Sequence, residues 1–378
     1  MTVAKAVQAD LKNRPQFGWI NGLKAGAAQL IVLHHLAFYG PMSDYVQPMW
    51  PALLDWLGDS ARIAVQVFLV IGGFLAARSL SPAGLPGLAL AASPSPWSAI
   101  WRRYAKLAPP FVAATLIAVL ANALAASVMT HESISAPATF SQIGAHALLL
   151  HGVLGYESLS AGAWYVAIDF QLYALAALLF WSTGRIAGQR RLPWLVPAIV
   201  ALCVAASLLY FNRDAGWDNW APYFFGSYGL GLLAWWASDP RRQGHAATIM
   251  LLLLIVPAWL ALALAFRTRI ELALAVACVL FLCGRSVKVL TGPLGAAVNT
   301  LGRISYAVFL IHFPVSLLVN TAFVRYAPLE PEWQALGMLT AWAASLAAGT
   351  AFHRWVEVPL GRMVQALLGR ALVRPISA

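Results

Sequence analysis

The chain has 378 residues, of which 61% are hydrophobic and only 10% are charged, and its net charge is +11. Soluble domains carry about 25% charged residues, so this composition excludes an ordinary soluble domain and indicates a membrane protein. No basic soluble module is visible, so the positive charge does not indicate nucleic-acid binding. It is better explained by membrane orientation and by contact with anionic lipid headgroups.

The chain opens on a polar segment, residues 1–21, without the apolar core of a signal peptide. Apolar runs then recur, each close to the 20 residues that cross about 30 Å of hydrocarbon as a helix. Ten such runs predict ten transmembrane helices, at 22–40, 62–80, 107–128, 163–184, 193–211, 219–238, 246–266, 270–284, 297–322 and 334–352.

A weaker apolar run at 141–155 carries His146 and His151. Cytoplasmic loops are enriched in lysine and arginine, and this bias decides whether the run crosses. If only the ten strong runs cross and the N-terminus is cytoplasmic, 20 of the 25 basic residues face the cytoplasm. The other five face outward: Arg62, Arg213, Arg267, Arg269 and Arg325. A crossing at 141–155 would put the basic loop 184–191 outside, so we expect a re-entrant or interfacial segment on the outer side.

These observations predict one all-α membrane domain over residues 1–378, with about ten transmembrane helices around an interior cavity. Both termini are expected in the cytoplasm, including the tail 353–378. No internal repeat is apparent. The three cysteines, Cys203, Cys278 and Cys283, lie in apolar runs without disulfide or zinc-ligand spacing, and no metal site is expected.

Ionisable residues inside the spans are costly and are candidates for function. His35 lies near the outer end of the first span, Asp169 about two turns from the outer end of the fourth, and His312 in the outer half of the ninth. We expect these three to meet, because a carboxylate beside a histidine helps it to take a proton from a hydroxyl. The alternative is that they only make helix–helix hydrogen bonds.

A second set of candidates lies toward the cytoplasm. Lys24 precedes His35 by eleven residues, which places both on one helix face about 16 Å apart. Several cations at that level suit a polyanionic ligand such as a nucleotide or phosphate ester, whereas snorkelling anchors and orientation signals are the structural alternative. The set comprises Lys24, Arg102, Arg103, Lys106 and Arg303.

Six segments in order resemble the acyltransferase-3 family of integral membrane acyltransferases, across nearly the full length. NGLKAGAAQLIVLHH resembles its opening motif, a basic residue followed by a histidine, and VFLVIGGFLAAR resembles its FFxxSGF stretch. WRRYAKLAPPF resembles RRxxRxxPxY, and AWYVAIDFQLY resembles WxLxxExxFY. LGRISYAVFLIHFPV resembles LGxxSYxxYLxHxP, and FHRWVEVPLGR resembles the closing YxxxExP element.

Four positions depart from the family pattern. Lys24 and Lys106 replace arginines, which keeps the charge but loses the planar fork that binds phosphate oxygens in pairs. Gly72 replaces the serine of the SGF element, and Asp169 replaces a glutamate. These changes indicate a divergent branch with a somewhat different site.

The resemblance implies a multi-pass enzyme of the bacterial inner membrane that moves an acyl group, commonly acetyl from acetyl-CoA, to a hydroxyl of a cell-surface or secreted carbohydrate. It implies that His35 is the base and that Lys24 handles the donor. Asp169 is the second catalytic candidate, and Arg102, Arg103, Lys106 and Arg303 are candidates for the donor phosphates. His312, Trp164 and Tyr173 are candidates for binding a carbohydrate or glycolipid acceptor, whereas Tyr306 and Glu357 are expected to be structural.

Two other functions are compatible with the sequence. Buried histidine and aspartate in a multi-span protein also suit a transporter or flippase for a glycolipid or polysaccharide, although such proteins usually show two related halves. A non-catalytic membrane partner of a polysaccharide synthase or exporter is the other alternative. Flux without turnover of acyl-CoA would favour the transporter.

Overall fold

The computed structural model describes residues 18–81, 95–190, 192, 194–286 and 291–373. Most of the polar segment 1–21 and the last five residues of the tail therefore lie outside the described residues. The described part is mainly helical and contains no strand, which confirms the all-α prediction. Its α-helices are α2 (Gly18–Phe38), α3 (Pro41–Val46), α4 (Pro51–Asp55), α5 (Val65–Leu80), α7 (Trp97–Ala126), α8 (Phe140–Ala147), α9 (Ala163–Arg190), α10 (Leu195–Leu209), α11 (Ala221–Ala237), α12 (His245–Leu264), α13 (Thr268–Cys283), α14 (Gly292–Tyr326), α15 (Pro331–Phe352) and α16 (Val358–Val373).

Short 3-10 and π-helical turns join some of these helices. A π-turn and a 3-10 turn lead from α4 into α5, two 3-10 turns lie between α10 and α11, and a π-turn joins α15 to α16. Their bounds are η1 (Trp56–Ser60), η2 (Ala61–Ala64), η3 (Phe211–Arg213), η4 (Ala215–Trp217) and η5 (His353–Glu357).

Each of the ten apolar runs lies on a helix of this bundle. In the described part, seven helical stretches are long and apolar enough to cross a membrane: 51–80, 97–126, 163–186, 195–213, 245–264, 292–326 and 331–367. Helix α2 is not among them, and α11 and α13, with 17 and 16 residues, are short for a span. The protein is thus multi-pass, and the count of ten stays a prediction.

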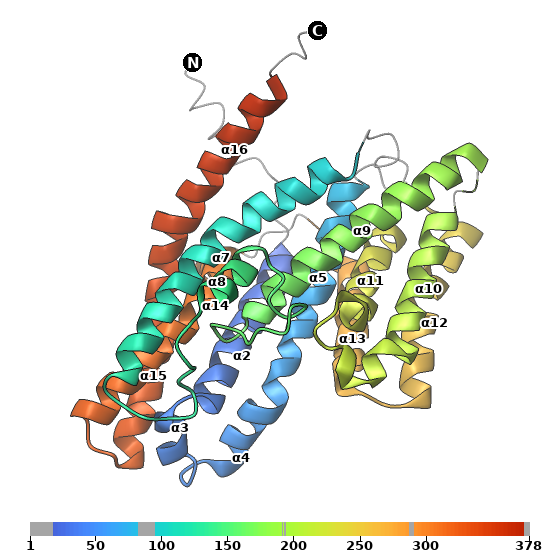
Figure 1. Ribbon diagram of the computed structural model, residues 1–378. Coiled ribbons are helices and arrows are strands. Elements are labelled where there is room, and N and C mark those ends of the chain that lie inside the picture. The colour runs from blue at the N-terminus through green and yellow to red at the C-terminus, as the bar shows by residue number, and fades with distance from the viewer. Residues whose placement is uncertain (1–17, 82–94, 191, 193, 287–290, 374–378) are drawn as a thin grey trace.

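Two groups of helices make the bundle (Figure 1). Helix α14 packs against α15, α2 and α7, while α11 packs against α5, α10, α13, α12 and α9. The groups meet where α2 contacts α5 and where α7 contacts α9. Side chains of α2, α7 and α14 can therefore face those of α5, α9 and α11 across one interior seam.

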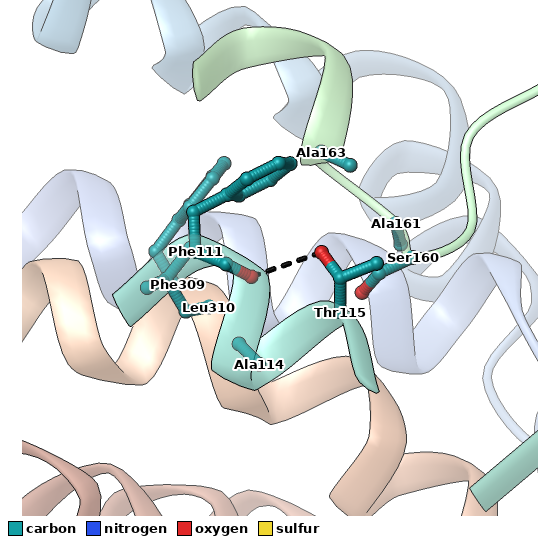
Figure 2. A pocket seen from close by; sticks show the side chains of 8 residues that line it. All are labelled: Phe111, Ala114, Thr115, Ser160, Ala161, Ala163, Phe309 and Leu310. Atoms are coloured by element: carbon teal, nitrogen blue, oxygen red, sulfur yellow. Dashed lines mark hydrogen bonds between the residues drawn. The ribbon is translucent and has the colours of Figure 1, made fainter. Parts of the chain in front are cut away.

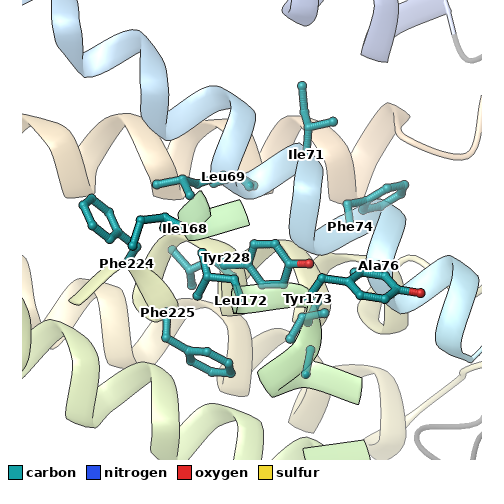
Figure 3. Close-up of a cluster of buried hydrophobic side chains, with 14 of the residues drawn as sticks. Leu69, Ile71, Phe74, Ala76, Ile168, Leu172, Tyr173, Phe224, Phe225 and Tyr228 are labelled. Atoms are coloured by element: carbon teal, nitrogen blue, oxygen red, sulfur yellow. The ribbon is translucent and has the colours of Figure 1, made fainter. Parts of the chain in front are cut away.

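Helix α11 lies in the interior of the second group. Every residue of α11 except Pro222 is buried, as expected for a helix that is apolar on all sides. A side chain at Gly73 of α5 would collide with the Tyr228 carbonyl of α11, and one at Gly231 of α11 would collide with the Val70 carbonyl of α5. The two backbones therefore touch. Figure 3 shows the apolar side chains that surround Tyr228 at this contact.

The weak run at 141–155 does not form a long helix. Helix α8 has eight residues and begins with a capping box at Thr139 and Gln142. The Tyr104 hydroxyl of α7 donates to the Ala147 carbonyl (2.8 Å), and His146 and His151 stack beside Phe111 of α7. The segment therefore packs along the middle of α7, and α9 begins there instead of at the end of the bundle (Figure 1).

Helix α7 differs from its expected range. It begins at Trp97 instead of near 107 and continues through Pro109 and Pro110. The Tyr306 hydroxyl of α14 donates to the Leu107 carbonyl just before the two prolines (3.1 Å). Arg102, Arg103 and Lys106 are therefore held on a helix.

Candidate active site

The two histidines expected near one level form a pair. His35 of α2 and His312 of α14 are buried, their rings are nearly parallel, and His35 Nδ1 lies 2.6 Å from His312 Nε2. His312 Nδ1 lies 3.1 Å from the Val308 carbonyl, which can only accept a hydrogen bond. His312 Nδ1 therefore carries a proton and its Nε2 accepts one from His35 Nδ1. In the neutral pair, His35 Nε2 keeps a free lone pair.

The neighbouring histidine has a different role. His34 Nδ1 donates to the Leu57 carbonyl (2.9 Å) in the turn that follows α4. This bond holds α2 against the segment leading into α5. His34 is thus a structural residue.

Asp169 does not join the histidine pair, so the expectation that all three meet is wrong. Its carboxylate forms an ion pair with Arg103 of α7. The reason is the position of α9, which begins beside the middle of α7. Asp169 lies six residues after the start of α9 and therefore reaches Arg103 of α7. Lys106, Glu357 and both members of this pair lie within electrostatic range of Lys24. We call Lys24, Arg103 and Lys106 the cation group.

Aromatic side chains surround the Arg103–Asp169 pair. The Arg103 guanidinium lies over the Tyr173 ring, 5.2 Å from its centre. Tyr228 is fully buried, and its hydroxyl has no hydrogen-bond partner within the described chain, nor has Arg103 Nε. Tyr228 was not among the sequence candidates. The one signal for it is a hydroxyl in the middle of the glycine-rich run FGSYGLG.

Gly72 of α5 completes this environment. A Cβ at Gly72 would lie 3.0 Å from Asp169 Oδ1 and 3.2 Å from the Tyr228 ring. The position at which the family pattern carries a serine thus faces the position at which it carries a glutamate. Here both residues are smaller, and the two changes meet at one contact.

The remaining candidates are spread more widely. Arg102 is exposed and bonds only to Ser98 of its own helix (3.4 Å), and Arg303 is exposed too. In the described structure no hydrogen bond or ion pair joins either residue to the cation group. Trp164 stacks on Phe224 of α11 at 5.4 Å between ring centres, and the Tyr173 hydroxyl lies 3.5 Å from that of Ser79.

Tyr306 and Glu357 make the structural contacts expected of them. Tyr306 joins α14 to α7 through the Leu107 carbonyl, and Glu357 accepts a hydrogen bond from His353 (2.8 Å) in the π-turn η5. Glu357 also supplies negative charge near Lys24.

Comparison with known proteins identifies the family. A sequence profile described as an acyltransferase domain, that of the acyltransferase-3 family, matches residues 17–352. No curated protein matches the chain. No solved structure matches it either. The profile spans both the histidine pair and the cation group, so this chain is an acyltransferase and belongs to the acyltransferase-3 family.

Proposed function

We propose that this acyltransferase moves the acetyl group of acetyl-CoA to a hydroxyl of a cell-surface or secreted carbohydrate in the bacterial inner membrane. The observation that carries the proposal is the His35–His312 pair, which leaves the basic Nε2 of His35 free on the same helix that carries Lys24. In the membrane topology that we propose, ten helices cross the membrane and both termini are cytoplasmic. One domain spans the chain.

The donor would approach from the cytoplasmic end, where α2 and α7 begin. Lys24 and Arg103 each lie about two turns into these helices, and with Lys106 they offer positive charge to the phosphates of coenzyme A. The Arg103–Asp169 ion pair holds one of these cations in place. Lys106 is exposed, as are Arg102 and Arg303, so all three would contribute at the cytoplasmic entrance for the donor.

The transfer itself is an acyl substitution. His35 Nε2 takes the proton of the acceptor hydroxyl as its oxygen attacks the thioester carbonyl carbon. The new C–O bond forms, the C–S bond breaks, and the coenzyme A thiolate leaves and receives the proton. His312 stabilises the protonated His35 by accepting its Nδ1–H bond throughout. Asp169 would act through Arg103, and Trp164 and Tyr173 would bind the acceptor.

The test compares cells that produce equal amounts of wild type, His35→Ala and His34→Ala. Alkali-labile acetate in the carbohydrate fraction is measured for each. The proposal predicts loss of the ester in His35→Ala and its retention in His34→Ala, the adjacent histidine on the same helix. Full ester content in His35→Ala would contradict it, and export of carbohydrate without cleavage of acetyl-CoA would favour a transporter.

A further inference from the structure

A small cavity lies between α7, α14 and the start of α9 (Figure 2). Its walls are mainly apolar, and no charged side chain lines it. Two hydroxyl residues, Thr115 and Ser160, also line it, and the Thr115 hydroxyl is already used, because it donates to the Phe111 carbonyl (2.9 Å). The space holds about one water-sized group. The apolar part of its lining comprises Phe111, Ala114, Ala161, Ala163, Phe309 and Leu310.

The cavity lies between the cation group and the histidine pair. On α14, Phe309 follows Tyr306, which contacts α7 one turn after Arg103, and precedes His312 by three residues. The rings of Phe309 and His312 are 6.1 Å apart between centres. A thioester whose coenzyme A is held by the cations would thus reach the cavity before it reaches His35.

The walls of the cavity are firmly held. Gly162 has a φ of +81°, and a Cβ there would lie 2.7 Å from the Phe309 ring. The same ring packs against Tyr165 at 5.4 Å and against Phe68 at 6.2 Å. Because these walls are close-packed, displacing them to admit additional methylene groups would cost free energy.

We propose that this cavity receives the methyl end of the donor's acyl group and limits the donor to a two-carbon acyl chain. The inference rests on the proposed function, which requires an acyl-CoA donor but does not assign residues to its acyl chain. A methyl group matches the cavity in size and polarity. A butyryl chain would have to displace Leu310 or Ala114. The terminal carboxylate of a succinyl group would be buried without a cation, which is strongly unfavourable.

The test is calorimetric binding of acetyl-CoA, butyryl-CoA and succinyl-CoA to the full chain in detergent. The proposal predicts that wild type binds acetyl-CoA about tenfold more tightly than either alternative. Leu310→Ala makes room for two methylene groups, so the ratio of butyryl-CoA to acetyl-CoA affinity should rise about tenfold. Leu317→Ala, a buried leucine of the same helix that does not line the cavity, should leave the ratio unchanged.

A second variant fills the cavity. Ala114→Val should weaken binding of acetyl-CoA severalfold, whereas Ala113→Val, on the same turn of α7 but outside the cavity lining, should not. The Leu310→Ala result is a change in the ratio of two affinities, which misfolding cannot imitate because it would weaken the binding of both donors. Equal affinities for the three donors in wild type, or an unchanged ratio in Leu310→Ala, overturn the pocket while the acyltransferase proposal stands. Failure of folded wild type to bind any acyl-CoA overturns both.

Discussion

His312 Nε2 accepts a hydrogen bond from His35 Nδ1 at 2.6 Å, while His312 Nδ1 is bound to the Val308 carbonyl. The direction of this chain of bonds fixes which nitrogen of His35 is basic. The Val308 carbonyl thereby determines that Nε2 is the basic nitrogen of His35. His312, which lies between them, is a positioning residue for His35.

This relationship predicts different results for three substitutions of His312. His312→Ala should lower kcat about 100-fold, because His35 loses the acceptor that orients it, with little change in affinity for acetyl-CoA. The amide oxygen of His312→Gln can replace Nε2 and should keep most of the activity. That of His312→Asn, which reaches only as far as Nδ1, should not. Equal kcat for the Gln and Asn variants would contradict the assignment.

The Arg103–Asp169 ion pair predicts a stability effect that depends on both partners. Asp169→Ala leaves the guanidinium without its counter-ion in a largely buried place and should lower the free energy of unfolding by about 3–5 kcal/mol. The double variant Arg103→Met/Asp169→Leu should recover most of that stability but not the binding of acetyl-CoA. Thermal unfolding in detergent measures both, and a double variant no more stable than Asp169→Ala would argue against the pair.

The contact between α5 and α11 predicts unequal effects of two glycine substitutions. Gly73→Ala places a methyl group against the Tyr228 backbone and should destabilise the protein by about 1–3 kcal/mol. Gly26→Ala, in an exposed position of α2 with no atom within 4 Å of the new methyl, should be neutral or stabilise by about 0.5–1 kcal/mol. Matching melting temperatures for the two variants would show that the backbones do not touch.

The sequence predicts the helices well because apolar length is a local property. All ten runs lie on helices, and the weaker run at 141–155 forms only the short helix α8. The apolar run predicts a span that starts at residue 107, whereas α7 begins ten residues earlier, at Trp97, because a helix can extend beyond its apolar part into a basic segment.

Contacts between helices depend on rotation and depth, which local patterns do not encode. Arg102 and Arg103 are adjacent in the sequence, yet the 100° step between them leaves one exposed and points the other at Asp169. The partner of Asp169 depends on where α9 begins, and that is set by the packing of α8 on α7. The sequence does predict that His35 and His312 meet, because both lie in the outer halves of their predicted spans.

The central claim is that α2 carries a donor end at Lys24 and a catalytic end at His35. The most direct test is calorimetric binding of acetyl-CoA to the detergent-purified wild type and to Lys24→Ala and His35→Ala, with Arg325→Ala, at the exposed end of α14, as the control. We expect binding that weakens about tenfold or more in Lys24→Ala and is nearly unchanged in the other two variants. Binding that is lost in His35→Ala but kept in Lys24→Ala, or absent from folded wild type, would contradict it.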